Sequence, residues 1–244
     1  MSKRVLISVF TLLCMPLLAL AISTSDLEPQ EPSEQQLRIL EIIDLSGLTG
    51  LSLQARNLAQ QALNEAEAPI GQQYEVVGAI AAVWAPDKLQ QQFESILANY
   101  DPTQLEQLAT TLRSQHLLLA REKEQRAVTE QSSQGYLRYM QRINTETVAE
   151  SRMQYIRDLD RAMQFSEMLL QTRESVYTEL EQNLSGWQPQ EQWQQSLRND
   201  VNGFLLYVHR DTSNEELQRL AQAYQQPQLQ AWLQQVGQVL QHKR

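Results

Sequence analysis

Two segments of this chain carry the same helix-start signal followed by the same apolar stripe. One runs from Ser213 to Leu229, and the other runs from Asp101 to Leu117, 112 positions earlier. Each begins with an N-cap residue, and a Glu or Gln three positions later completes a capping box, as Glu216 does after Ser213. Apolar residues then recur at the spacing of one helix face. They are Leu217, Leu220, Ala221 and Tyr224 in the later segment and Leu105, Leu108, Ala109 and Leu112 in the earlier one.

The composition favours helix throughout the chain. The 244 residues include only 8 glycines and 8 prolines, and Gln, Leu, Ala and Glu outnumber the strand formers Val, Ile and Thr. We therefore predict an all-α fold, a tandem or duplicated helical bundle of about ten helices. The first helical half is expected at residues 34–134 and the second at residues 135–244. The sequence leaves open whether the halves share one core or form two.

Capping and breaking residues set the expected helix ends. Ser33 opens a third capping box, and Gly47 ends the helix that follows it. Pro86 suits the first turn of a helix, whereas Pro227 should kink or break the last helix near residues 224–226.

Three further patterns concern helix faces and lengths. A long helical pattern covers residues 136–184, with an expected division near residues 144–147. The charged run at residues 121–124 reads as a solvated extension of the helix after Leu117. In residues 74–84 the predicted buried side carries Val77, Ile80, Ala81 and Trp84.

The N-terminus has the pattern of a secretory signal peptide. Two basic residues precede an uncharged apolar run from Val5 to Ala21, which ends in Ala-Leu-Ala. We predict a signal peptide at residues 1–21, cleavage near Ala21 and a periplasmic or secreted protein. An uncleaved N-terminal anchor is the alternative, because the run approaches the shortest length that spans a bilayer. The acidic, proline-containing residues 22–33 predict a disordered tether.

Charge and cysteine usage narrow the function classes. Cleavage would remove Lys3 and Arg4, which leaves 18 basic against 29 acidic residues and a net charge of −11. An acidic chain without a basic stripe suits neither nucleic acid nor anionic lipid, so we predict no nucleic-acid partner. We also predict no membrane span in the mature chain. The only cysteine, Cys14, lies in the predicted signal peptide, which leaves the mature chain without a disulfide or a thiol nucleophile.

The late cap-and-stripe segment resembles a motif of a family of secreted bacterial all-helical domains with no assigned function. The family motif reads Ser/Thr-x-x-Glu-Leu-x-x-Leu-x-x-Phe-Tyr-x-Ser-Pro-x-Gly. The resemblance implies an exported helical fold, here as two diverged copies, and it implies no reaction. The matching residues are Ser213, Glu216, Leu217, Leu220, Tyr224 and Pro227 in the later copy and, more loosely, Asp101, Leu105, Leu108 and Ser114 in the earlier one, while Leu117 and Leu229 replace the motif glycine.

No catalytic or metal-binding pattern stands out. His116, His209 and His242 form no His-x-x-x-His pair, which would place two ligands on one helix face. His209 with Asp211 could form a weak ion site or a hydrogen-bonded pair, and the competing interpretation is a plain loop histidine beside a helix cap. We therefore predict no catalytic residue, no metal site, no cofactor and a protein that is not an enzyme.

Aromatic side chains of the second half are the best candidates for a binding surface. Tyrosine and methionine recur from Tyr136 to Tyr177, and such side chains fill adaptable apolar grooves. The same spacing also builds an ordinary core, which is the competing interpretation. Tyr155 lies one step round its helix from the apolar face, where its hydroxyl could reach a groove rim. The candidate interaction or groove residues are Tyr136, Tyr139, Tyr155, Tyr177, Trp187, Trp193, Tyr224 and Trp232.

Together these patterns predict a non-enzymatic protein of the cell envelope that acts through helix-face contacts with other proteins. The alternative is a carrier that holds a small apolar or lipid-like ligand in a cavity between helices. A weaker alternative is a hydrolase-type enzyme built on His209 and Asp211.

Overall fold

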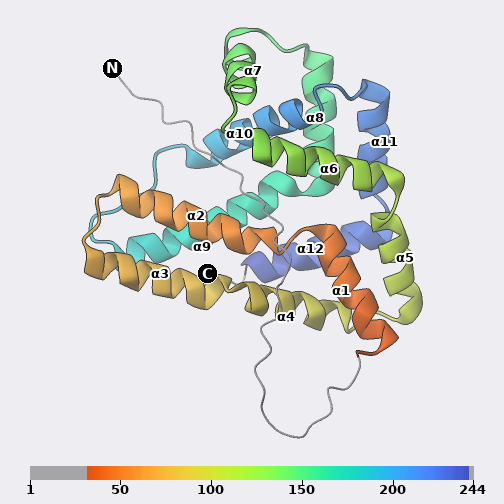
Figure 1. The fold of residues 1–244 in the computed structure, drawn as a ribbon, viewed down its shortest axis with the longest axis horizontal. Coiled ribbons are helices and arrows are strands. Elements are labelled where there is room, and N and C mark those ends of the chain that lie inside the picture. Colours follow the sequence, from red (N-terminus) through yellow and green to blue (C-terminus); the bar gives the residue numbers. More distant parts are fainter. Residues whose placement is uncertain (1–31, 242–244) are drawn as a thin grey trace, which may run out of the picture.

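Twelve α-helices and no β-strand make up the part of the chain that the structure describes, residues 32–241 (Figure 1). The structure is a computed structural model, and it confirms the predicted all-α bundle. In chain order the helices are α1 Glu34–Ser46, α2 Gly50–Glu65, α3 Ile70–Trp84, α4 Pro86–Leu97, α5 Pro102–Leu112, α6 Gln115–Glu130, α7 Gln134–Thr145, α8 Glu150–Met163, α9 Phe165–Asn183, α10 Trp193–Val208, α11 Asn214–Tyr224 and α12 Pro227–Gln241.

Several predictions concern residues outside the described range. The predicted signal peptide at residues 1–21, the first ten residues of the predicted tether and His242 all lie there. Export and a periplasmic or secreted location therefore stay predictions. Within residues 32–241, no helix combines the length and the apolar character needed to cross a lipid bilayer.

All three predicted capping boxes are present. At the start of α11, the Glu216 amide donates to Ser213 Oγ over 3.2 Å, and the Ser213 amide donates to Glu216 Oε2 over 2.8 Å. Asp101 and Gln104 exchange the same pair of hydrogen bonds at α5, both 2.9 Å long. Ser33 caps α1 in the same way. Local hydrogen bonding of the chain with itself thus fixes where these helices begin.

The two prolines singled out in the sequence, Pro86 and Pro227, lie at helix starts. Pro86 occupies the first turn of α4, where its missing N–H removes no helical hydrogen bond. Pro227 is the first residue of α12, whereas α11 ends at Tyr224. The bend predicted near residues 224–226 is therefore a complete break between two helices.

The long helical pattern of residues 136–184 divides into three helices. The gap between α7 and α8 agrees with the predicted division near residues 144–147. A second break, between α8 and α9, was not predicted, because Gln164 adopts the left-handed region, with φ 54° and ψ 27°, without a glycine there to signal it. The Gln164 side-chain amide donates to Gln230 Oε1 of α12 over 3.2 Å. This partner is 66 positions away, so the break depends on tertiary packing.

The buried face of α3 is turned relative to its predicted face. Ile80 and Trp84 are buried as expected, together with Val76. Val77 is 45% exposed and Ala81 is also exposed, so these two predicted core positions were wrong. Both faces fit a helical period, and the neighbouring helices α2 and α9 select between them.

One continuous cluster of buried apolar side chains includes residues of both predicted halves. Phe93 of α4 meets Trp232 of α12 edge to face, with ring centroids 5.5 Å apart. Trp84 Nε1 donates to Ser175 Oγ of α9 over 3.2 Å. Helix α9 lies among α2, α3, α8, α10 and α12, which Figure 1 shows around it. The halves share a core, while the predicted boundary at residues 134 and 135 stays a prediction.

Removing a capping side chain tests the helix starts. Ser213→Ala should lower the free energy of unfolding by about 1 kcal/mol, because the Glu216 amide loses its acceptor. Asp101→Ala should have a similar effect at α5. Urea denaturation followed by circular dichroism measures both losses. Thr49→Ala is the control, because Thr49 precedes α2 without a side-chain capping hydrogen bond; an equal loss in all three variants would contradict the capping explanation.

Candidate functional site

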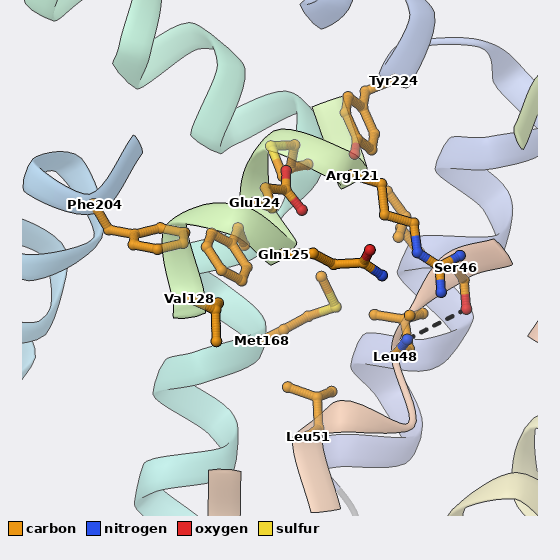
Figure 2. Close-up of a pocket in the computed structure, with 14 residues that line it drawn as sticks. Ser46, Leu48, Leu51, Arg121, Glu124, Gln125, Val128, Met168, Phe204 and Tyr224 are labelled. Atoms are coloured by element: carbon orange, nitrogen blue, oxygen red, sulfur yellow. Dashed lines mark hydrogen bonds between the residues drawn. The ribbon is translucent and has the colours of Figure 1, made fainter. Parts of the chain in front are cut away.

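A mostly apolar cavity of about 110 Å³ lies where α6, α10, α11 and α12 meet the α1–α2 turn and the α8–α9 corner (Figure 2). Its apolar wall comes from six segments that are distant in sequence. One carboxyl, one guanidinium, one phenol hydroxyl, one serine hydroxyl and one amide interrupt that wall. The lining residues are Ser46, Gly47, Leu48, Leu51, Arg121, Glu124, Gln125, Val128, Met163, Phe165, Met168, Phe204, Tyr224 and Leu233.

Two backbone reversals shape the cavity. Gly47 ends α1 with φ 68°, a conformation that suits glycine, and the turn directs Leu48 and Leu51 toward the cavity. Ser46 Oγ supports this turn by donating to the Ile43 carbonyl over 2.7 Å. On the other side, the left-handed Gln164 turns the chain from α8 into α9. This corner brings the side chains on either side of it, among them Met163 and Phe165, into the same wall.

Glu124 of α6 is the most unusual group in the cavity. Its Oε1 atom is buried and has no hydrogen-bond partner among residues 32–241. Burial raises the pKa of the Glu124 carboxyl to about 7, and the nearby Arg121 guanidinium only partly opposes that rise. Near neutral pH the carboxyl is therefore present in both its protonated and ionised forms. It can donate a hydrogen bond in one form and accept in the other.

Arg121 and Tyr224 flank the carboxyl. Figure 2 shows the Tyr224 hydroxyl end directed toward the part of α6 that carries both Arg121 and Glu124. Burial raises the pKa of Tyr224 well above its usual value, so its hydroxyl stays neutral. Arg121 Nη2 lies 4.0 Å from Oδ1 of the exposed Asp44. Arg121 therefore connects the cavity rim to solvent, whereas Glu124 lies further inside.

The interpretation of residues 121–124 as a solvated extension was wrong for Glu124. On α6 the buried residues Leu117, Ala120, Ala127 and Val128 define the inner face. Glu124 lies four positions after Ala120 and four before Val128, so it belongs to that face. The sequence signal that could have found it is an acidic residue at a stripe position.

Among the eight predicted site residues, Tyr224 alone lines this cavity. Tyr177, Trp187 and Trp193 lie together in a separate pocket beside α2. Tyr155 lines a pocket between α8 and α11, next to Leu217. Trp232 is fully buried in the core.

Tyr136 and Tyr139 attach α7 to α10. Their rings pack edge to face on Tyr207, with centroid distances of 4.7 and 5.2 Å. The Tyr139 hydroxyl donates to the Leu206 carbonyl over 3.0 Å. A Cβ on Gly203 would lie 2.7 Å from Met140 Cε, so the glycine allows the close approach of α7. These two tyrosines serve a helix contact.

His209 and Asp211, considered from the sequence as a possible pair, have different partners. His209 is buried at the end of α10, with Nδ1 3.4 Å from Thr212 Oγ1. Burial, with Lys123 and Arg152 nearby, lowers the pKa of His209 to about 3. Asp211 is exposed, and its carboxylate lies 3.7 Å from Arg210. Across the described residues, no group of three or more His, Cys, Asp or Glu side chains is placed to hold a metal ion.

No protein-family model, curated protein or solved structure matches this chain. The resemblance to secreted helical domains thus rests on the motif residues alone and stays a prediction.

The buried carboxyl gives the fold a specific pH dependence. The pKa of Glu124 is about 7 in the folded chain and about 4.5 when exposed, so folding binds a proton between these values. The favourable contribution of this proton binding to the free energy of unfolding is complete below pH 4.5 and is lost as the pH rises through about 7. Glu124→Gln removes the ionisable group. Between pH 4.5 and pH 8, the free energy of unfolding of this variant should therefore rise relative to that of the original chain by on the order of 3 kcal/mol.

Denaturant titrations at pH 4.5, 6 and 8 measure this difference. Glu122→Gln is the control, because Glu122 is exposed two positions away. Parallel pH profiles for the original chain and Glu124→Gln would show that the carboxyl ionises normally.

Proposed function

We propose that this protein binds a small, mostly apolar molecule in the cavity beside Glu124, as a carrier or receptor and not as an enzyme. The observation that carries the proposal is the buried Glu124 oxygen without a partner, at the wall of an otherwise apolar cavity. A buried polar atom without a hydrogen bond costs free energy, and a ligand that supplied the missing partner would recover it.

The cavity limits the size of the bound part. An engineered cavity of about 150 Å³ in another protein holds benzene, and this one measures about 110 Å³. It therefore suits a short branched chain, or a ring admitted by small side-chain movements. Met163 and Met168 favour such adjustment, because unbranched thioether side chains repack easily.

The electrostatics favour a hydroxyl as the polar end of the ligand. A hydroxyl accepts from protonated Glu124 and donates to the ionised form, so it satisfies the carboxyl on both sides of its pKa. A cationic ligand would meet the Arg121 guanidinium at the same wall. The best-fitting class is therefore a small apolar alcohol.

Benzyl alcohol and toluene test this preference, because they differ by one hydroxyl. The original chain should bind the alcohol about tenfold more tightly, and Glu124→Met should lose the preference. Labelled methyl groups of Met163 and Met168 report binding by NMR at the cavity, while Met140 on α7 serves as a remote reference.

Glu122→Met is the matched control and should keep the preference. Unchanged Met163 and Met168 signals up to the solubility limit of both probes would reject the cavity as a binding site. If the probes do bind, native mass spectrometry of protein isolated from its source would identify the physiological ligand. Protein that is repeatedly empty would count against a carrier role.

Contact with other proteins is the second candidate, favoured by the outer face of α3. Ile70 is 71% exposed, Tyr74 is 76% exposed and Val77 is 45% exposed, and the three follow one another along α3 at the helical spacing i, i+4 and i+7. Glu75 is the only charged residue of this helix. An exposed apolar helix face with so little charge suits the apolar helix face of a partner protein.

A photoreactive residue in place of Tyr74 tests this contact in cell extracts. We expect one discrete cross-linked product that disappears when Val77→Lys is added. The same residue in place of Leu137, which is 40% exposed on α7, is the control and should give no such product. Identical products from both positions, or none from Tyr74, would count against a specific α3 contact.

A further inference from the structure

A second pocket combines three aromatic rings: Tyr177 from α9, Trp187 from the segment between α9 and α10, and Trp193 from the start of α10. Tyr177 lies against Trp187 and Trp193 edge to face, with both centroid distances 5.0 Å and interplanar angles of 62° and 73°. All three side chains are partly exposed, whereas Trp84 and Trp232 are fully buried in the core. The aromatic faces at this pocket are thus available to a ligand.

The pocket has a volume of about 220 Å³ and a mixed wall. Leu58 and Ala62 of α2 close its apolar side, and glutamines surround its mouth. The remaining lining residues are Gln61, Glu65, Ala66, Arg173, Gln188, Gln190 and Ser196. None of these residues lines the cavity beside Glu124, so the two sites are separate.

Arg173 is the unusual group in this wall. It is only 6% exposed, yet none of the ion pairs among residues 32–241 includes it. Its guanidinium lies beside Tyr177 and partly opposes the burial that raises the pKa of that phenol. A buried guanidinium without a carboxylate partner is costly, and its planar donors match a carboxylate well.

The nearby acids do not supply that partner. Burial raises the pKa of Asp200 on α10, and Arg173 only partly opposes this rise. Glu65 lies at the exposed rim of the pocket. Arg173 therefore remains the one strong anion-binding group of this wall.

We propose that this pocket binds a small ring-bearing carboxylate, with the carboxylate on Arg173 and the ring against Trp187 and Trp193. A cavity of about 150 Å³ holds benzene, so about 220 Å³ accommodates one ring with its acidic group. The proposal is independent of the cavity beside Glu124. Two sources share this chemistry: an acidic sugar, whose hydroxyls would bond the three lining glutamines, and an aromatic acid.

Calorimetric titrations with four probes separate these possibilities. Glucuronate and benzoate carry the carboxylate, and glucose and benzamide are their neutral counterparts. At least one acid should bind at least tenfold more tightly than its neutral counterpart, because a charge-assisted bidentate contact is strong. The acid that binds identifies the source. Equal affinities within both pairs, or no binding of either acid, would overturn the proposal.

Variants then locate the binding. Arg173→Met should abolish the preference for the acid, and Arg173→Lys should keep it at reduced affinity, because the charge remains but the planar fork is lost. Arg198→Gln is the matched control, since it removes an exposed guanidinium of α10 outside the pocket. Retained acid preference in folded Arg173→Met would overturn the assignment.

Two measurements remain decisive if Arg173→Met fails to fold. In the original chain the acid should shift the indole N–H signals of Trp187 and Trp193 and leave those of Trp84 and Trp232 unchanged. Glu65→Gln should strengthen acid binding about twofold, because it removes a like charge from the rim. Binding that shifts neither Trp187 nor Trp193 lies elsewhere and rejects this pocket.

Discussion

The burial of α9 is the constraint on which the other helices depend. Helices α2, α3, α8, α10 and α12 all pack against it, so it has to accommodate polar side chains in a nearly closed environment. Thr172 donates to the Met168 carbonyl over 2.9 Å, and Ser175 accepts from the Trp84 indole. Arg173 is buried without an ion pair, and it lines a pocket whose one carboxylate, Glu65, lies at the exposed rim. Polar groups that the fold itself does not pair thus mark where a ligand could act.

The sequence correctly predicted the helix starts that depend only on nearby residues. The capping boxes at Ser33, Asp101 and Ser213 and the proline at the start of α4 depend on residues within one turn, and all appear where expected. The left-handed Gln164 was not predicted, because its stabilising contact comes from α12. Which face of α3 is buried likewise depends on its neighbours, since its apolar residues surround the helix too evenly for periodicity to choose.

The candidate sites were predictable only in part. Tyr177, Trp187 and Trp193 were chosen as aromatic groove residues, and the structure brings them together in one pocket. Glu124 and Arg173 were missed, because a charged residue in a helical pattern normally faces water. Glu124 Oε1 is buried without a hydrogen-bond partner and Arg173 is buried without an ion pair, and only the assembled helices create either environment.

Helix α7 contributes less to the buried core than any other described helix. It lies at one edge in Figure 1, contributes no fully buried residue, and rests on α10 through two tyrosines and the Met140–Gly203 contact. Detaching it would uncover no fully buried side chain of its own, unlike any other described helix, so we expect its local opening to cost less free energy than opening the core helices. We therefore expect the amides of α7 to exchange with solvent before those of the buried helix α9.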